Sequence, residues 1–362
     1  MPPTLRSHSG EVVKFPIICT ANIDPKVLND VLTERFVLVG KRDMSELLTS
    51  DDKPINSFET PFNLKVPEIL QAVSEFMDAA KTKKGISKNT FVVLDSTTAK
   101  DKTTCQVAID SRHEEELYWD YVPFRCELSS LIPALEALEH GDGTATARKL
   151  RNEAAMVGGV WKQQQVDAVR NKQSRLAAAD FPKSEAWDEY CGAESSESAL
   201  PYVPVFRTAD ISLETLNDFL EQTYDQDWGD EEIADPRVAF VTSLSPPYHN
   251  GPASAPLGTK PPVPEIFSGL PAEDCDTITC SCFPAEDPEL NYNRFIVLDE
   301  YTETEKTVII ASNAELDGIL QLARCDFKGA LIQLLAPQET GLTIDQLACE
   351  AVLDGAGIIR AP

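Results

Sequence analysis

The chain has 362 residues, of which 42% are hydrophobic and 25% charged; this is typical of a folded globular protein and not of a disordered one. Its net charge of −27 excludes the usual nucleic-acid-binding and membrane-surface proteins, because both need clustered Lys and Arg. No run of 18 apolar residues occurs and no apolar N-terminal segment is visible, so we expect neither a membrane span nor a secretory signal.

The first folded element is a predicted strand at 15–19, after a disordered N-terminus at 1–10. Residues 15–32 align without a gap with 203–220, at a constant offset of 188, and eight of the eighteen positions are identical. Each segment predicts a buried strand, a polar step and a helix. Asp24 caps this helix in the first copy, with Pro25 at its first position, and Ser212 caps it in the second. The alignment indicates an internal duplication.

The region after this block differs between the copies. In the first copy, apolar residues at helical spacing predict a helix at 67–81. In the second, we predict a strand at 238–242, followed by a stretch with eight prolines at 246–271. Because proline continues neither regular structure, we expect an extended or disordered loop there.

A second repeated block aligns 91–103 with 295–307, and seven of its thirteen positions are identical. Each copy predicts a strand that ends in Asp95 or Asp299, a turn, and a second strand, which together indicate a β-hairpin. The second strands are expected at 105–109 and 308–311. An amphipathic helix is then expected to close each copy, on Leu128, Leu131, Ile132 and Leu135 in the first and, at the offset of 188, on Leu316, Ile319, Leu320 and Ala323 in the second.

Between the copies, residues 145–179 predict a long helix or a helix pair, with Gly158 and Gly159 as the only breaker. A capped helix is also expected at 343–354. We therefore predict an α/β (or α+β) fold of two tandem related units, each a small mixed sheet with flanking helices, in a pseudo-two-fold arrangement. The predicted boundaries are 11–140 for the first unit, 141–198 for a helical spacer with a polar linker at 185–198, 199–335 for the second unit, and 336–362 for a C-terminal helix and tail.

Polar residues that occur in both copies are the first candidates for a ligand site. Asp95 and Asp299 end predicted strands, where ligands bind in open α/β sheets, and a carboxylate there can hold a cation or act as a base. The pattern Asp-x-x-Thr before a Lys-Thr pair favours the alternative, in which the carboxylate binds backbone N–H groups of a turn. The ligand-binding candidates are Asp95, Thr98, Thr208, Thr302 and Lys306.

Metal binding finds little support in the sequence. Cys275, Cys280 and Cys282 form C-x4-C-x-C with His249 upstream, a poor match to the paired spacing of zinc sites. We expect loop thiols or a transient disulfide there and predict no metal. The acidic run at 225–235 does not match a calcium loop, because Gly229 takes its fifth position, so it predicts a solvated loop.

Motifs of the common catalytic classes are absent. The four histidines, His8, His113, His140 and His249, lie in predicted loops or tails, and no G-x-S-x-G is present. No dinucleotide or phosphate-loop glycine motif occurs either, so we predict no cofactor. The nine cysteines are scattered and odd in number, which indicates free thiols and a cytoplasmic location.

The second copy, over about 203–310, resembles a family of short single-unit proteins of unknown function. The resemblance rests on VFRTADISLETLNDFL, on an acidic stretch with Asp235-Pro236, and on FIVLDEYTETEKTVII. The family's members open with an R-T-D-F-S type strand and helix start and carry a V-L-D-x-x-T strand and turn. The first copy departs from this pattern, with Cys19 at the position of Arg207 and Asn22 at that of Asp210. The resemblance implies a shared fold unit and no activity.

Two functions remain open from the sequence. The first is a non-enzymatic binding protein, with a protein partner or a small ligand and no nucleic acid or membrane, because the repeated positions are mostly apolar or turn-forming while the loops vary. The alternative is a hydrolase or lyase in the second unit that uses the carboxylates of Asp210 and Asp299, with Arg207 as an anion anchor.

Overall fold

A computed structural model of the chain describes residues 13–41, 45–60, 85–87, 90–101, 104–111, 120–141, 143–171, 202–225, 237–261, 267–286, 289–314, 319–340, 343–353 and 357–361. The predicted helix at 67–81, the N-terminus at 1–10 and the linker at 185–198 lie outside these residues. The chain divides into two compact units, described separately below. Unit 1 comprises Met1–Ala154, Gly159–Gln163 and Cys349–Gly357, and unit 2 comprises Ala155–Gly158, Gln164–Ala348 and Ile358–Pro362.

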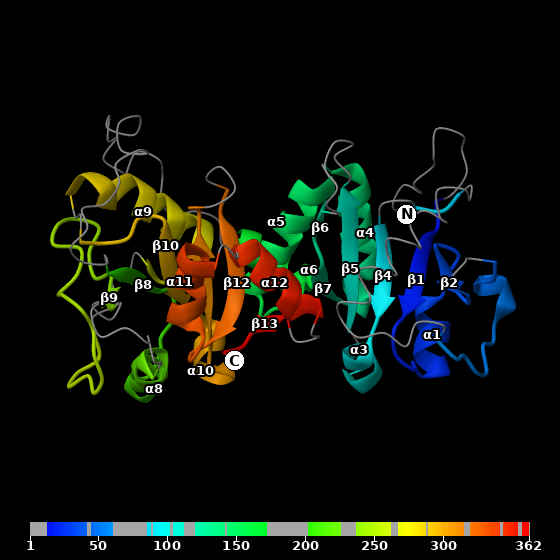
Figure 1. The fold of residues 1–362 in the computed structure, drawn as a ribbon, viewed down its shortest axis with the longest axis horizontal. Coiled ribbons are helices and arrows are strands. Elements are labelled where there is room, and N and C mark those ends of the chain that lie inside the picture. The colour runs from blue at the N-terminus through cyan, green and yellow to red at the C-terminus, as the bar shows by residue number, and fades with distance from the viewer. Residues whose placement is uncertain are drawn as a thin grey trace. The chain divides into compact units, whose positions relative to one another are not determined.

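Unit 1 contains, within its described residues, a seven-stranded mixed sheet in the order β3-β2-β1-β4-β5-β6, with β7 also paired to β5 (Figure 1). The strands are β1 (Phe15–Cys19), β2 (Phe36–Val39), β3 (Leu47–Leu48), β4 (Thr90–Leu94), β5 (Thr104–Ser111), β6 (Asp120–Tyr121) and β7 (Phe124–Glu127). The helices are α1 (Pro25–Val31), α3 (Ser96–Asp101), α4 (Leu131–His140) and α5 (Gly143–Met156), with short 3-10 turns η1 (Ser50–Asp52) and η2 (Leu128–Ser130).

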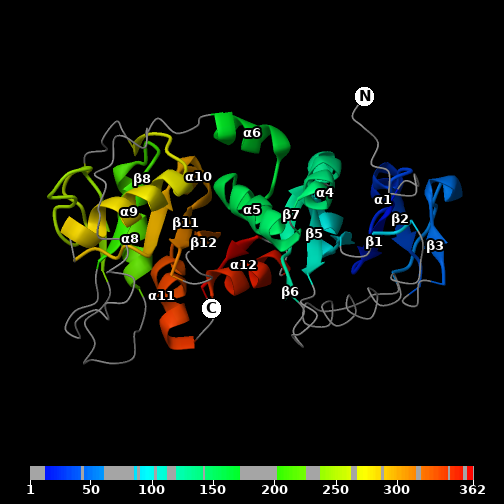
Figure 2. The same cartoon turned by 90° about the horizontal axis from the view of Figure 1, so that it is seen from above.

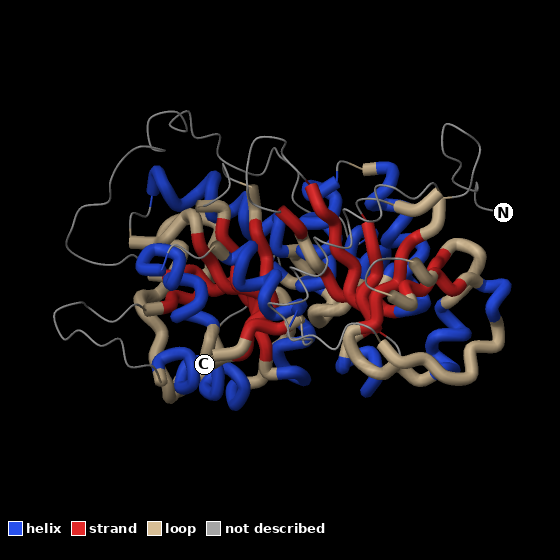
Figure 3. The backbone as a smooth tube through the Cα atoms, turned by 45° about the vertical axis from the view of Figure 1, so that its right-hand side comes forward, coloured by secondary structure: helices blue, strands red, loops and turns tan. Residues whose placement is uncertain are grey.

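Unit 2 contains, in the part that the structure describes, a six-stranded mixed sheet in the order β13-β12-β11-β10-β8-β9. The strands are β8 (Val203–Arg207), β9 (Val238–Phe240), β10 (Arg294–Leu298), β11 (Thr307–Ser312), β12 (Gln321–Asp326) and β13 (Ile358–Ile359). The helices are α6 (Gln163–Asn171), α8 (Leu213–Tyr224), α9 (Ala272–Glu286), α10 (Glu300–Glu305), α11 (Ala330–Thr340) and α12 (Ile344–Leu353), the last of which passes into unit 1 at Cys349. Figure 3 shows the strands of each unit, in red, flanked by helices in blue.

Both units are mixed α/β, and five strands of each sheet pair in the same order and sense. In unit 1, β2, β1 and β4 are parallel neighbours, and β5 and then β7 follow antiparallel. In unit 2, β9, β8 and β10 are parallel, and β11 and β12 follow antiparallel. The registers of the two sheets also agree. Gln106 of β5 pairs with Arg125 of β7, and at the corresponding position of unit 2 Ile309 of β11 pairs with Arg324 of β12.

The predicted hairpins at the FxVLD blocks are confirmed, but a short helix replaces the expected turn. β4 and β5 pair antiparallel around α3, and β10 and β11 pair antiparallel around α10. Lys306 ends α10 in the left-handed conformation, with φ 54°, which turns the chain into β11.

The prediction of a helix that closes the second copy on Leu316, Ile319, Leu320 and Ala323 is wrong. Leu316 lies outside the described residues, Ile319 and Leu320 precede β12, and Ala323 lies within it. Ile319 is 53% exposed, although a helical stripe would bury it. Pairing along the whole of β11 determines the conformation here and overrides the helical spacing. The helix that follows the last antiparallel strand of unit 2 is α11, as α4 follows β7 in unit 1.

Several local predictions are confirmed. The Asp24 carboxylate accepts a hydrogen bond from Lys26 N at 2.8 Å, and the Ser212 hydroxyl accepts one from Thr215 N at 3.1 Å, so both residues cap helices as expected. The spacer forms the helix pair α5 and α6, which Gly158 and Gly159 separate with φ of 84° and 87°. At such positive angles a side chain is strained, so glycine is favoured.

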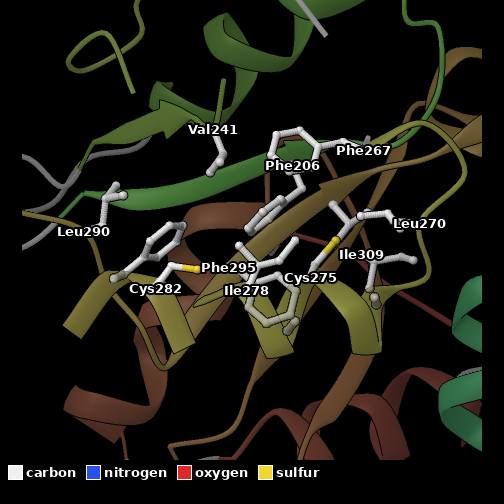
Figure 4. Packing of buried hydrophobic residues seen from close by; sticks show 14 of the residues in the cluster. Phe206, Val241, Phe267, Leu270, Cys275, Ile278, Cys282, Leu290, Phe295 and Ile309 are labelled. Atoms are coloured by element: carbon white, nitrogen blue, oxygen red, sulfur yellow. The ribbon is translucent and has the colours of Figure 1, made fainter. Parts of the chain in front are cut away.

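The sheet of unit 2 buries aromatic side chains against α9 on one face (Figure 4). Phe206 of β8 lies at the centre, with its ring 5.8 Å from that of Phe295 and 6.3 Å from that of Phe283 on α9. Seen from above, α9 lies beside these strands (Figure 2). The opposite face packs on α8 and α11, where Phe219 and Phe327 are 5.5 Å apart. Burial of each such ring contributes about 1.5–3 kcal/mol.

The proline-rich stretch contributes to the same core. Its described parts, 246–261 and 267–271, contain no strand and no α-helix, as predicted, yet the side chain of Tyr248 is fully buried against Phe283. Phe267, in the second of these parts, is also fully buried, against Phe206. The described parts are therefore packed onto the unit rather than disordered. Among the described helices, none is long and apolar enough to cross a bilayer.

Candidate functional site

The repeated aspartates lie where two parallel strands end, and each caps the helix that follows. Asp299 comes directly after β10; its carboxylate accepts from Tyr301 N at 3.1 Å and from the Thr302 hydroxyl at 3.3 Å. Asp95 comes directly after β4 and accepts from Thr98 N at 2.9 Å and from the Thr98 hydroxyl at 3.2 Å. The predicted alternative of a carboxylate bound to backbone N–H groups therefore describes the contacts of both aspartates.

A buried arginine faces each of these carboxylates. Arg125 of β7 pairs through Nη2 with Asp95, and Arg324 of β12 pairs through Nη2 with Asp299. Arg324 is 1% exposed, and its Nη1 also donates to Asp299 Oδ1 at 3.2 Å. Because each charge is surrounded by protein and faces an opposite charge, the pair joins the end of β10 to β12 and the end of β4 to β7.

The remaining donors of Arg324 are also engaged. Its Nε donates to the Ala155 carbonyl at 2.8 Å and its Nη1 to the Thr307 hydroxyl at 3.1 Å, and its Cζ lies 5.1 Å from the centre of the Tyr301 ring. Neither arginine was among the residues predicted from the sequence, although a signal was present. Phe-Arg-Cys-Glu at 124–127 and Ala-Arg-Cys-Asp at 323–326 align at an offset of 199, which matches neither repeated block.

Thr208 extends the strand pairing. Its backbone N donates to the Leu298 carbonyl at 2.9 Å and its hydroxyl to the same oxygen at 3.3 Å. Thr20 repeats both bonds with Leu94 in unit 1, at 2.9 Å and 3.5 Å. Both threonines thus bind the neighbouring parallel strand just beyond the last paired residues.

Thr208 and Asp299 also line a small pocket at the carboxyl ends of β8 and β10. Its volume is ≈ 30 Å³, which is room for water or a small ion and far less than a drug-sized ligand needs. Glu300 is the other charged residue that lines the pocket. The rest of the lining is formed by Met156, Val169, Gly269, Leu270, Pro271, Ala272, Val297 and Ile309.

Lys306 lies away from this pocket. Its Nζ donates to the Thr215 hydroxyl at 2.7 Å and lies 3.4 Å from an Asp218 carboxylate oxygen, so it joins the end of α10 to α8. Glu303 of α10 makes a second link, because it accepts from Ser212 N at 2.9 Å. This backbone hydrogen bond, the largest effect, lowers the pKa of Glu303.

The three residues of the catalytic hypothesis have separate partners. Asp299 pairs with Arg324, whereas the Asp210 side chain is 92% exposed and pairs with Lys260. Arg207 ends β8, is 3% exposed, and donates from Nη1 to the Pro261 carbonyl at 2.7 Å. Burial lowers the pKa of Arg207, and the negative charge of Asp210 raises it in part. Among the described residues, no hydrogen bond or ion pair joins Arg207 to either carboxylate.

The three cysteines lie on α9, not in the expected loop. Cys275 and Cys282 are buried in the core of unit 2 (Figure 4), and burial raises the pKa of Cys275 well above its usual value. Cys280 contacts Asp276 and Asn313, and burial, the largest effect, raises its pKa to about 12. Cys275 and Cys282 thus have the apolar surroundings of unreactive thiols, whereas Cys280 is partly buried and lies beside polar side chains. Within the described residues, no cluster of three His, Cys, Asp or Glu side chains has the geometry of a metal site.

Two of the four histidines fall within the described residues. His140 is the last residue of α4 rather than part of a loop, and its ring lies 2.7 Å from the Glu136 carbonyl. His249 lies in the proline-rich stretch, with its ring centre 5.7 Å from that of Tyr202.

No family model matches this chain, and neither the curated proteins nor the solved structures contain a significant match. The resemblance of the second copy to short proteins of unknown function therefore stays a prediction.

Proposed function

We propose that the chain is a binding protein made of two related units, and that unit 2 carries the ligand site. The observation that supports this most is that the carboxylates needed for catalysis are already engaged. Asp299 holds Arg324 and the start of α10, and Asp210 lies in solvent beside Lys260. A general acid and base must instead face a common reacting atom.

The surface of the described residues favours a small ligand over a large apolar partner. Ile319 is the one large hydrophobic side chain in these residues that is mostly exposed, whereas protein-binding faces usually have a contiguous apolar patch. The carboxyl ends of the parallel strands β8 and β10 are the position at which open α/β sheets bind small ligands. We therefore assign the site to this edge of unit 2.

Binding and turnover can be measured in one experiment. The full chain is mixed with a panel of small organic acids, amines and neutral compounds, and ligand-observed NMR follows both the line widths and the chemical identity of each compound over a day. We expect at least one compound to broaden and to remain unchanged.

Conversion of any compound, lost in the Asp210→Asn variant, would replace this proposal with the hydrolase or lyase alternative. The carboxamide of this variant cannot act as a base, and its position in solvent makes a folding defect unexpected. If no compound in the panel broadens, small-ligand binding is rejected for these three chemical classes.

A further inference from the structure

Arg207 has buried N–H groups that donate to no acceptor among the described residues. Its Nη1 donates to the Pro261 carbonyl at 2.7 Å, but Nε and Nη2 are both buried and have no hydrogen-bond partner within the part of the chain that the structure describes. Leaving a buried donor unpaired costs about 1–3 kcal/mol, and more when the group is charged. Such groups are uncommon in folded proteins, and each calls for an explanation, such as a bound water, ion or ligand.

The two unpaired nitrogens form one edge of the guanidinium plane. Nε–H and Nη2–H point in the same direction, and this edge can bind two oxygens of a carboxylate or phosphate side by side. Arg324 shows the opposite situation, because its Nε donates to Ala155 and its Nη2 to Asp299. An open edge is therefore not required of every buried arginine in unit 2.

Arg35 in unit 1 also has its Nε and Nη2 buried without a partner among the residues that the structure describes, yet its charge is compensated. Its Nη1 lies 3.4 Å from a Glu136 carboxylate oxygen, and its Cζ lies 5.7 Å from the centre of the Phe15 ring. Arg207 forms no ion pair with the described residues, and the nearby Asp210 pairs with Lys260 instead. Arg35 therefore serves as a matched control.

The position of Arg207 also favours a ligand. It ends β8, whose neighbours β9 and β10 are both parallel to it, and thus lies at the edge where open α/β sheets bind ligands. The aligned residue of unit 1 is Cys19, a fully buried thiol whose pKa burial raises. A cation at this position is therefore particular to unit 2.

We propose that Arg207 binds the carboxylate of a small organic acid side-on, through Nε and Nη2. This rests on the proposed binding function and names its ligand class. A single buried cation balances one negative charge, whereas a dianionic phosphate would bring a second charge out of water without a partner. Both nitrogens are shielded from solvent, so carboxylate binding requires displacement of the groups that cover them.

The test uses the full chain and sodium acetate, benzoate, phosphate and chloride at equal ionic strength. The Nε–H resonance of Arg207, assigned by its loss in Arg207→Met, is followed by NMR, and thermal unfolding is measured in parallel. We expect acetate and benzoate to shift this resonance saturably and to raise the Tm, and phosphate and chloride to do neither.

Two variants separate side-on binding from simple attraction of an anion. Arg207→Lys keeps the charge but loses the planar fork, so carboxylate affinity should fall about tenfold or more. Arg35→Met should leave the affinity unchanged. Circular dichroism establishes that each variant is folded, and Arg207→Lys keeps the test decisive if Arg207→Met does not fold. An unchanged affinity in folded Arg207→Lys, a stronger response to phosphate, or no saturable response to either carboxylate would overturn the proposal.

The same measurements distinguish a failure of the Arg207 site from a failure of the proposed binding function. If a carboxylate binds at Arg207 and is chemically converted, the site stands and the binding function is rejected. If another compound binds equally well in wild type and Arg207→Met while carboxylates do not bind, the binding function stands and the Arg207 site is rejected.

Discussion

Replacing Arg324 by Met removes the cation that faces the buried Asp299 carboxylate. We expect the free energy of unfolding of unit 2 to fall by about 3–5 kcal/mol, because a buried carboxylate would be left without its charge partner. Arg324 is 1% exposed, so solvent does little to screen the pair. The side chain also loses its bonds to Ala155 and Thr307, which places the expected value in the upper half of this range.

The double variant Asp299→Asn/Arg324→Met separates the charge effect from lost packing. Asn remains a good helix cap for α10 and carries no charge, so the double variant should be more stable than Arg324→Met by about 1 kcal/mol or more. Hydrogen exchange with mass spectrometry in increasing urea reports the opening free energy of β10–β12 separately from that of β1–β7.

Arg125→Met, with and without Asp95→Asn, repeats this comparison in unit 1 and should give the same pattern in its own strands. A loss below about 1 kcal/mol in Arg324→Met would show that the ion pair is not a buried structural contact. Strictly additive effects in the double variant would refute the role assigned to the uncompensated charge.

Two further predictions concern α9. Burial raises the pKa of Asp274, whose Oδ2 has no hydrogen-bond partner among the described residues, so its charged form disfavours folding. Asp274→Asn should therefore be more stable than wild type at pH 7. This gain in stability should disappear as the pH falls through the raised pKa of the folded state to the unfolded value near 3.9. A stability difference that does not change with pH in urea titrations would contradict this prediction. Cys280, with a pKa of about 12, should be alkylated by iodoacetamide at pH 8 far more slowly than a peptide thiol, because only about one molecule in ten thousand carries the thiolate. The labelling is measured by mass spectrometry of the tryptic peptide that contains Cys280. Labelling at the rate of a peptide thiol would show that Cys280 is not buried.

Local signals in the sequence predicted much of the fold. The strands at 15–19 and 203–207 follow from short apolar runs, and the caps Asp24 and Ser212 follow from residue type and spacing. The helix predicted on Ile319 and Ala323 failed because apolar spacing over a few residues fits either structure. There the choice depends on pairing with β11, a contact that no local pattern contains.

The ion pairs were missed for a related reason. Asp95 and Asp299 were found because they lie in ungapped repeated blocks, whereas Arg125 and Arg324 lie beyond loops of different length and no longer share the blocks' offsets. A lone arginine in an apolar strand has no local role. Its role becomes visible only when the sheet brings it to the carboxylate 25 or 30 residues earlier in the chain.

The contrast between Arg207 and Arg324 bears on where the function lies. Arg324 has its counterpart in Arg125, and both are balanced by carboxylates of their own unit, so these residues stabilise the scaffold. Arg207 has no counterpart, since Cys19 takes its place in unit 1, and its charge lies in a buried position with an unpaired edge. A thiol at this position serves folding at no such cost, so the proposed carboxylate ligand gives the guanidinium of unit 2 a role that stability alone does not.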